Sequence, residues 1–396
     1  MCKVYSVKCM KIAYLIGSLN RGGAETLLLD IFRKAEKAPF EMMVIHRKGG
    51  MYEQEFMQLK SQCVQLVPHK WRLLSYLQQL RKRLVDEHVT VIHAFYRLDV
   101  VYAWLATIGV RIPIVVTFHG YMGSECGWGM SLFYRVVMRL ADKLCFVSGE
   151  QMKAYETRYG AVVRKKGVVL YNGIDFTKFD SIKPREDLTS EIGNLTFDKS
   201  SGIRLCMVGN FNSVRSQMVV CRALQKLKEK IEFYFVGGRY KGEEHYYDEC
   251  VSYCKEPCLD NVHFFGTRND VPAILKSMDG FVYSSRNDTF GIAVIEAIAS
   301  GLPVVVNDHP VMKEVCGAPN AGIRYFRTDD AEDAAAQIDA MIVNIEQSKQ
   351  AAKANAVAVR NKYSIQTHIE RLSALYDEIE QKTDRQKRKI IKKIPL

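Results

Sequence analysis

The first half of the chain alternates short apolar runs with segments that have a helical apolar spacing. The apolar runs that predict strands are residues 11–17, 40–45, 89–94, 114–118 and 143–148. Segments such as 25–35 and 71–84 place apolar residues three and four positions apart, which predicts helices. Strands that alternate with helices form parallel sheets covered on both faces.

The same alternation restarts after a polar stretch at residues 182–202, which predicts a linker. The strand candidates that follow are residues 204–208, 232–236, 262–265, 280–284 and 303–306. Helical runs lie between them, for example 218–230 and 271–277. The pattern therefore predicts an α/β protein built from two Rossmann-like, doubly wound domains.

These patterns divide the chain into four parts. We expect a first domain at residues 1–181, a second at 182–362, a closing helix at 363–381 and a basic tail at 382–396. In doubly wound folds ligands bind at the carboxyl ends of the strands, so we expect the site in a cleft between the two domains.

Composition and charge narrow the class of protein. The chain has 396 residues, of which 48% are hydrophobic, and this excludes a disordered or fibrous protein. The net charge of +12 is uneven: residues 1–180 hold 26 basic and 15 acidic residues, whereas residues 181–381 are acidic overall and residues 382–396 are strongly basic. This asymmetry indicates an anionic partner on one side. No nucleic-acid recognition motif is present, so we expect no nucleic acid partner.

The cysteines indicate a reducing compartment and no metal site. Their number, eleven, is odd, and they are scattered through apparent strands and helices. Cys250, Cys254 and Cys258 are spaced by four and would line one helical face. Structural zinc motifs use tighter cysteine pairs, so a packed helix is the preferred interpretation.

The strongest chemical pattern lies at residues 279–306. A strand leads into a polar loop, and Gly291 then opens a nearly apolar helix, residues 292–300. Glycine lets the backbone approach a ligand closely, and the free amides of the first helical turn form an anion site. Glu296 is the single charged residue in that helix. It either binds a sugar diol at the cleft or is a carboxylate stabilised by the helix dipole.

Three further motifs follow predicted strands. Residues 206–211 (CMVGNF) end a strand in a glycine turn, and Arg215 comes six residues after Gly209. Arginine suits a phosphate because its planar fork donates two hydrogen bonds. Gly22 and Gly23 form a glycine pair after the first strand, which alone is only a weak signal. His119 ends another strand, where a structural role is the common alternative to a functional one.

The spacing of Asp288 and Glu296, followed by residues 297–305 (AIASGLPVV), resembles the signature of glycosyltransferase family 4. These are retaining enzymes with the two-domain GT-B fold, and the resemblance covers residues 10–381. It implies that Glu296 binds the nucleotide ribose and that Asp288 lies near the donor sugar. The family usually has Glu in place of Asp288. The resemblance also implies that the amides of Phe290, Gly291 and Ile292 hold the donor phosphates.

The resemblance assigns roles to the other motifs as well. It implies that Gly22 and Gly23 approach the donor phosphates, that His119 lies beside the transferred sugar, and that Thr267 and Arg268 meet the base.

The diphosphate site departs from the family pattern at one position. The family usually has arginine directly after the glycine of the 206–211 turn, where this chain has Asn210, while Arg215 keeps the second charge. The candidates for the missing cation are Arg268, Arg286 and Arg21.

The sequence is therefore interpreted as a retaining glycosyltransferase with His119, Asp288 and Arg215 as catalytic residues. We expect a nucleotide-diphosphate sugar donor, with UDP favoured over GDP-mannose, and neither metal nor other cofactor. The expected acceptor is a glycan or lipid-linked glycan of bacterial capsule, exopolysaccharide or lipopolysaccharide. We expect a cytoplasmic protein, peripheral on the inner face of the cell membrane, held to anionic lipid by its basic tail and first domain. The alternatives are a nucleotide-sugar 2-epimerase with the GT-B fold and a non-catalytic nucleotide-sugar-binding protein.

Overall fold

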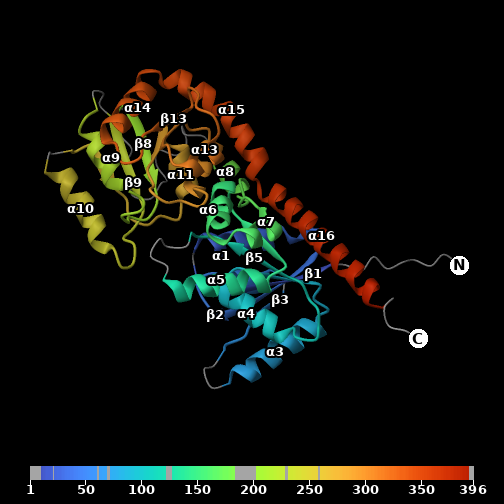
Figure 1. Ribbon diagram of the computed structural model, residues 1–396. Coiled ribbons are helices and arrows are strands. Elements are labelled where there is room, and N and C mark those ends of the chain that lie inside the picture. The colour runs from blue at the N-terminus through green and yellow to red at the C-terminus, as the bar shows by residue number, and fades with distance from the viewer. Residues whose placement is uncertain are drawn as a thin grey trace. The chain divides into compact units, whose positions relative to one another are not determined.

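The computed structural model describes residues 10–20, 22–59, 62–68, 72–121, 127–182, 202–227, 231–256 and 259–391, without the side chains of 35, 384 and 386–391. The chain forms two compact units (Figure 1). Unit 1 comprises Met1–Gly173 with Ile365–Leu396, and unit 2 comprises Ile174–Ser364. Each unit is described by itself.

Unit 1 is built on a seven-stranded sheet with the order β3-β2-β1-β4-β5-β6-β7, in which all neighbours are parallel. Its strands are β1 (Lys11–Ser18), β2 (Glu41–Lys48), β3 (Gln62–Gln65), β4 (Val91–Ala94), β5 (Ile114–Phe118), β6 (Lys143–Phe146) and β7 (Gly167–Val169). Its helices are α1 (Gly23–Arg33), η1 (Ala35–Lys37), α2 (Glu53–Gln58), α3 (Leu73–Asp86), α4 (Arg97–Ala106), α5 (Trp128–Leu140), α6 (Gly149–Tyr159), α7 (Ala161–Lys166) and α16 (Ile365–Ile391).

Unit 2 has a six-stranded parallel sheet with the order β10-β9-β8-β11-β12-β13. Its strands are β8 (Ile203–Val208), β9 (Ile231–Val236), β10 (Val262–Phe264), β11 (Gly280–Tyr283), β12 (Val304–Asn307) and β13 (Ile323–Phe326). Its helices are α8 (Thr177–Asp180), α9 (Gln217–Leu224), α10 (Glu244–Lys255), α11 (Val271–Lys276), α12 (Ile292–Ala299), α13 (Pro310–Cys316), α14 (Ala331–Val343) and α15 (Ile345–Tyr363). In both units the strand order reverses beside the first strand, which marks the topological switch point where ligands bind in such sheets.

The predicted fold class is confirmed, because both sheets are parallel and doubly wound. All ten predicted strands form, and β3, β7 and β13 are additional. The predicted domain boundaries stay predictions; the two units divide at Gly173 and Ser364. Helix α16 continues past Gln381 to Ile391, so part of the segment predicted as a separate tail is helical. Most of the predicted linker lies outside the described residues.

Helix α16 belongs to the core of unit 1 although it ends the chain. Its apolar side packs with residues of β1, β2 and α1. A buried hydrogen-bond network joins it to the sheet: the Tyr376 hydroxyl lies 2.6 Å from His93 Nδ1 and donates to the Tyr14 hydroxyl at 3.0 Å. His93 Nε2 lies 2.7 Å from Thr117 Oγ1. The buried side chains of Tyr14, His93 and Tyr376 therefore have hydrogen-bond partners.

The described cysteines are free thiols, and most of them are buried. Cys250 and Cys254 lie on α10 and face the core, while Cys258 lies outside the described residues. Within the described part of the chain no cluster of three metal-ligating side chains occurs. None of the helices described there combines the length and the apolar character needed to cross a bilayer.

Candidate functional site

Unit 2 gathers a charged cluster at the switch point of its sheet, where the loops after β8 and β11 meet. Asp288, only 9% exposed, lies between β11 and α12. Its Oδ2 atom accepts hydrogen bonds from Arg215 Nη1 and from the Tyr283 hydroxyl, both at 2.6 Å. Its Oδ1 atom accepts from the amides of Phe290 at 3.1 Å and Gly291 at 3.0 Å. Four donors therefore converge on one carboxylate, which is the arrangement of an anion site.

This cluster brings together residues that the sequence assigned to the donor phosphates. Arg215 and the amides of Phe290 and Gly291 all contact Asp288. A phosphate that binds these groups must therefore compete with the Asp288 carboxylate. Gly291 has a φ of 77°, and a Cβ atom there would lie 2.7 Å from Met312 Cε. Only glycine fits this turn without strain.

Arg215 folds back toward the end of β8. A Cβ atom on Gly209 would lie 3.8 Å from Cδ and Nε of Arg215. The Arg215 guanidinium stacks 5.2 Å from the centre of the Tyr283 ring. About a third of the Arg215 side chain is exposed, so its charge is accessible to a ligand. Tyr283 was missed by sequence reasoning, although its place at the end of β11 was a usable signal.

Asn210 follows β8 and Thr267 follows β10, and both contact Gly238, which follows β9, the strand between those two. Asn210 Oδ1 accepts from the Gly238 amide at 3.3 Å, and the Thr267 side chain lies against the Cα atom of Gly238. The loops after β8, β9 and β10 are tied together in this way. Asn210, which stands where the family usually has arginine, therefore has a structural contact.

The candidates for the missing cation have acidic partners where they are described. Arg268 donates to both carboxylate oxygens of Asp270, at 2.8 and 2.6 Å. Arg286 Nε lies 2.9 and 2.8 Å from the two carboxylate oxygens of Asp329. Arg21 lies outside the described residues. The ion pairs raise the pKa of Arg268 and of Arg286, which keeps both charged.

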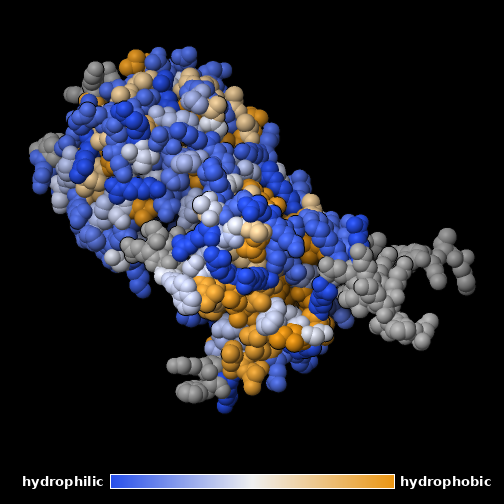
Figure 2. Space-filling view, viewed as in Figure 1, coloured by the Kyte–Doolittle hydropathy of each residue, from blue (hydrophilic) through white to orange (hydrophobic). Residues whose placement is uncertain are grey.

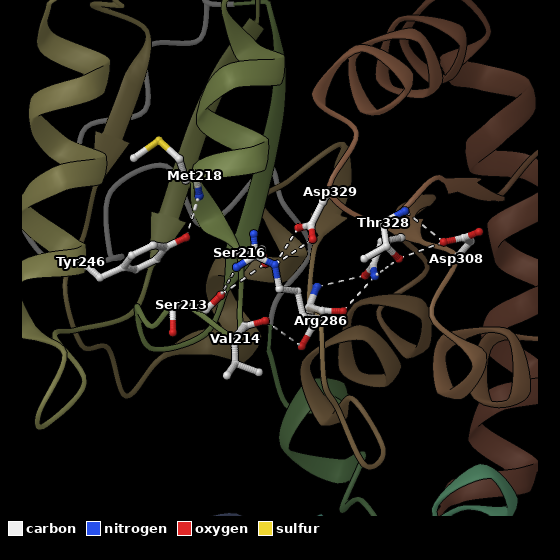
Figure 3. Close-up of polar contacts among 11 residues, drawn as sticks. Ser213, Val214, Ser216, Met218, Tyr246, Arg286, Asp308, Thr328 and Asp329 are labelled. Atoms are coloured by element: carbon white, nitrogen blue, oxygen red, sulfur yellow. Dashed lines mark hydrogen bonds and ion pairs between the residues drawn. The ribbon is translucent and has the colours of Figure 1, made fainter. Parts of the chain in front are cut away.

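Figure 3 shows how Arg286 connects the loop after β11 to the loop that carries Arg215. Arg286 Nη1 donates to the Ser213 carbonyl at 3.2 Å, and the Arg286 amide donates to the Val214 carbonyl at 2.8 Å. Asn307, at the end of β12, holds the loop after β11. Its Oδ1 atom accepts from the Ser285 amide at 3.0 Å, and its Nδ2 atom donates to the Ser285 carbonyl at 2.8 Å. Asn307 was also missed; a buried amide at a strand end was its signal.

Glu296 lies half-buried on the side of α12 that faces away from the core. Val294, Ile295, Ala297 and Ile298 are buried, whereas Ile292 and Glu296 remain partly exposed. Residues four positions apart share a helix face, so Glu296 lies one turn along from the amide of Ile292. The position is compatible with the ribose role, which stays a prediction.

Unit 1 has its own group at the equivalent switch point, where the loops after β1 and β4 meet. Gly22 and Gly23 begin α1, and the Glu25 side chain packs against the Cα atom of Gly22. Glu25 is buried and accepts a hydrogen bond from the Tyr96 hydroxyl at 2.6 Å. The glycine loop predicted to approach phosphates thus carries a carboxylate, which sequence reasoning did not single out.

His119 follows β5 and stacks on Phe95, with ring centres 5.0 Å apart and an angle of 13° between the planes. Burial, and to a smaller extent the charge of His368, lowers the pKa of His119 to about 3, so the imidazole is neutral at physiological pH. His119 lines a pocket of about 190 Å³ together with Arg97, Tyr121 and Tyr134. The Arg97 guanidinium lies 4.5 Å from the centre of the Tyr134 ring and contacts its hydroxyl. This pocket offers one cation, phenol groups and a neutral imidazole.

Comparison with known proteins gives a family match for each half of the chain. A family model described as Glycosyltransferase Family 4 matches residues 21–178, and one described as Glycosyl transferases group 1 matches residues 196–357. The putative glycosyltransferase EpsF of Bacillus subtilis is 22% identical over 311 residues, which cover 75% of this chain and 79% of EpsF.

Two further similarities concern a lipid-linked substrate and a bound nucleotide. The N,N'-diacetylbacillosaminyl-diphospho-undecaprenol alpha-1,3-N-acetylgalactosaminyltransferase of Campylobacter jejuni is 25% identical over 263 residues, 66% of each chain. The crystal structure of Anabaena HepE in complex with UDP and glucose has a TM-score of 0.78 and 19% identity, and covers 93% of this chain and 99% of HepE.

The two Rossmann-like units and the similarity to HepE over 93% of the chain identify the fold as GT-B. The two family models cover most of the chain in sequence order, one on each unit. The chain belongs to the family 4-like glycosyltransferases of the GT-B fold, and it is a glycosyltransferase.

Proposed function

We propose that the protein is a retaining glycosyltransferase that moves a sugar from a nucleotide-diphosphate sugar to a glycan or lipid-linked acceptor. The observation that carries the proposal is the convergence of Arg215 and the amides of Phe290 and Gly291, just before α12, on Asp288 at the switch point of unit 2. A diphosphate offers the same kind of oxygen acceptors as that carboxylate, with more charge. The proposed pathway is the synthesis of a bacterial cell-surface polysaccharide, as the names of the relatives suggest.

The proposed donor is a UDP-sugar rather than GDP-mannose. The HepE complex with UDP and glucose supports this choice, because its fold is the same. Glu296 would bind the ribose hydroxyls, and backbone groups near Thr267 and Arg268 would meet the base. Helix α12, which carries Glu296, comes after β11, and the loop of Thr267 and Arg268 follows β10; both strands belong to the same parallel sheet.

The proposed mechanism rests on stabilising the leaving diphosphate. As the anomeric carbon–oxygen bond breaks, negative charge grows on the phosphate, and Arg215 with the amides of Phe290 and Gly291 stabilises it. Donor binding would replace Asp288 as the acceptor of these hydrogen bonds and free its carboxylate for the donor sugar. The acceptor hydroxyl would attack from the same face and give its proton to the leaving phosphate. Fixed cationic and amide donors supply the stabilisation, so we expect activity without a divalent metal.

His119 would serve the transferred sugar as a neutral group. An imidazole with a pKa of about 3 hydrogen-bonds to a hydroxyl without adding a charge. The pocket that it shares with Arg97 in unit 1 would receive the acceptor, and the cation would suit a phosphate-linked glycan. We propose a cytoplasmic enzyme attached peripherally to the inner face of the membrane, with the basic residues 382–396 contributing to attachment.

The test is a donor screen followed by a transfer assay. UDP-sugars should raise the melting temperature more than GDP-mannose, because only a bound ligand stabilises the folded state. The stabilising donor should then be transferred to a lipid-linked acceptor with retention of anomeric configuration, observed by NMR, in the presence of EDTA. Epimerisation of the donor alone would overturn the proposal, as would an inverted product.

A pair of variants links this activity to the cluster. Arg215→Ala should abolish most transfer, whereas Arg222→Ala, an exposed arginine on α9, should leave it unchanged. Equal activity of the two variants would contradict the role of Arg215.

A further inference from the structure

Unit 2 has a further pocket at the outermost strand of its sheet. Strand β13 ends the strand order, and the pocket against it has a volume of about 820 Å³. We call it the β13 pocket. Residues of α13, of the loop before β13, of β13 and of α14 line it, among them Lys313, Asn320, Ile323, Arg324, Tyr325 and Gln337. The volume is in the range of sites for small organic ligands.

The β13 pocket lies apart from the cluster around Asp288. That cluster forms where the loops after β8 and β11 meet, at the carboxyl ends of the strands. The pocket instead includes Gly317 and Asn320, which come before β13, so it reaches the amino end of that strand. In a parallel sheet the two kinds of strand end lie on opposite sides, and the donor belongs at the carboxyl ends. A ligand in the β13 pocket is therefore not the donor.

The charges of the β13 pocket favour an anion. None of the described residues that line it is acidic, whereas Lys313 and Arg324 are both basic. The Nε atom of Arg324 is buried and has no hydrogen-bond partner among the described residues. A buried donor without an acceptor is costly, and an oxyanion in the pocket would supply the acceptor.

Lys313 is available to the same ligand. Its Nζ atom lies 3.7 Å from Asp308 Oδ2, and its side chain is 56% exposed. An ion pair of this length and exposure contributes little, so Lys313 can turn toward a bound anion. On the face that Figure 2 shows, the surface of unit 2 is mostly hydrophilic, which favours a polar ligand over an apolar partner.

The wall of the pocket is held in place by hydrogen bonds. The Tyr325 hydroxyl donates to the Gly317 carbonyl at 2.6 Å. Asn320 Oδ1 accepts from the Gly322 amide at 2.8 Å, and Asn320 Nδ2 donates to Asn355 Oδ1 on α15 at 3.2 Å. The loop before β13 is thereby fixed to β13 and to α15. A wall that is ordered in advance loses less conformational freedom when a ligand binds.

We propose that the β13 pocket binds a small organic molecule through a phosphate monoester group. Such a group carries about 1.5 to 2 negative charges at pH 7, which matches the two cations. Arg324 donates to the phosphate oxygens from Nε and an adjacent Nη atom, and Lys313 adds the second charge. The organic part of the ligand packs on Ile323 and on the ring of Tyr325. The inference goes beyond the proposed function, which uses the opposite side of the sheet.

The experiment is calorimetry of the full chain with phenyl phosphate as the probe. The protein is first saturated with UDP, so that the donor site is filled. Phenyl phosphate should bind at concentrations up to about 5 mM, whereas phenol, which lacks the phosphate, should not.

Matched variants locate the binding. Arg324→Gln should weaken binding of phenyl phosphate at least about tenfold, because a charge-assisted hydrogen bond is lost. Lys313→Gln should weaken it as well, and this exposed side chain can be replaced without disturbing the fold. The control is Arg222→Gln, which removes an exposed arginine of α9 in the same unit and should bind the probe like the unchanged protein.

Each outcome decides the proposal. Absence of binding overturns it, and so does equal affinity of Arg324→Gln, Lys313→Gln and the control. Phenol that binds as tightly as phenyl phosphate excludes the phosphate role. Binding that is lost in Arg215→Ala but kept in Arg324→Gln places the probe in the cluster around Asp288 and also overturns the proposal. A melting temperature that UDP does not shift would count against the proposed donor, while the comparison of the Arg324 and Arg215 variants would still decide the β13 pocket.

Discussion

Acid should destabilise unit 1 strongly, because three of its histidines are buried in neutral form. Burial lowers the pKa of His93 and of His119 to about 3 and that of His368 to about 4. In the unfolded chain each titrates near its ordinary value of about 6.5. The unfolded state therefore binds more protons below that pH. Stability is fully present above about pH 6.5 and is lost as the pH falls toward the folded-state values.

The size of the effect follows from these values. From pH 7 to pH 5 each histidine lowers the free energy of unfolding by about 2 kcal/mol, so the three together lower it by about 6 kcal/mol. Asp99 acts in the opposite direction, because burial raises its pKa to about 6 despite the ion pair with Arg47. Asp99 takes up a proton in the folded state, and this increases the free energy of unfolding by about 1 kcal/mol at pH 5. The net loss of about 5 kcal/mol is comparable with the whole stability of many domains.

Tryptophan fluorescence suits the measurement, because all three tryptophans, Trp71, Trp104 and Trp128, belong to unit 1. Urea unfolding would be followed at pH 7 and at pH 5. In His93→Gln the decrease in the free energy of unfolding from pH 7 to pH 5 should be smaller by about a third. The variant should be less stable than the unchanged protein at both pH values, because the contacts of His93 to Tyr376 and Thr117 change. A free energy of unfolding that is the same at pH 7 and pH 5 would refute the reasoning. An unaltered loss in His93→Gln would show that His93 is not among the groups responsible.

Three further outcomes test the donor site. Glu296→Gln should keep the fold and weaken UDP binding by about 1–3 kcal/mol, because a charged acceptor becomes neutral; calorimetry that finds unchanged affinity would exclude the ribose role. Arg215→Ala should lower kcat more than donor affinity, since the diphosphate gains charge as the bond breaks; an equal loss of affinity for the plain nucleoside would indicate misfolding instead. Asn210→Arg should raise the affinity for UDP if the missing cation limits binding, and titration that shows no gain would mean that another cation already fills that place.

The sheets were predictable because their strands are buried on both faces and appear as continuous apolar runs. Two of the strands that escaped prediction, β3 and β13, lack this signal. The sequence of β3, QCVQ, is half polar because it is an edge strand with partly exposed residues. The end of α16 was missed for a related reason: past Gln381 the chain is strongly basic, and charge alone does not distinguish a helix from a tail.

The site was predictable where neighbours in space are also near in sequence. The glycine turn and Arg215 lie within one loop, so their proximity followed from spacing. The pairing of Arg215 with Asp288 joins residues 73 positions apart and depends on β8 and β11 being adjacent. The contact between Glu25 and Tyr96 likewise depends on β1 lying beside β4. Such pairs follow from strand order, which a single sequence does not specify.

The place of α16 has a consequence for how the protein is made. Unit 1 is begun first by the ribosome, yet its core needs Leu372 and Tyr376 from the last helix. All of Ile174–Ser364 is synthesised in between, which takes on the order of 10–40 s at typical rates of translation. During that time the surfaces of β1 and α1 that α16 covers have no intramolecular partner from this helix. Unit 2 is contiguous in the chain, so it is free to fold during synthesis, and we expect the unit that is translated first to be completed last.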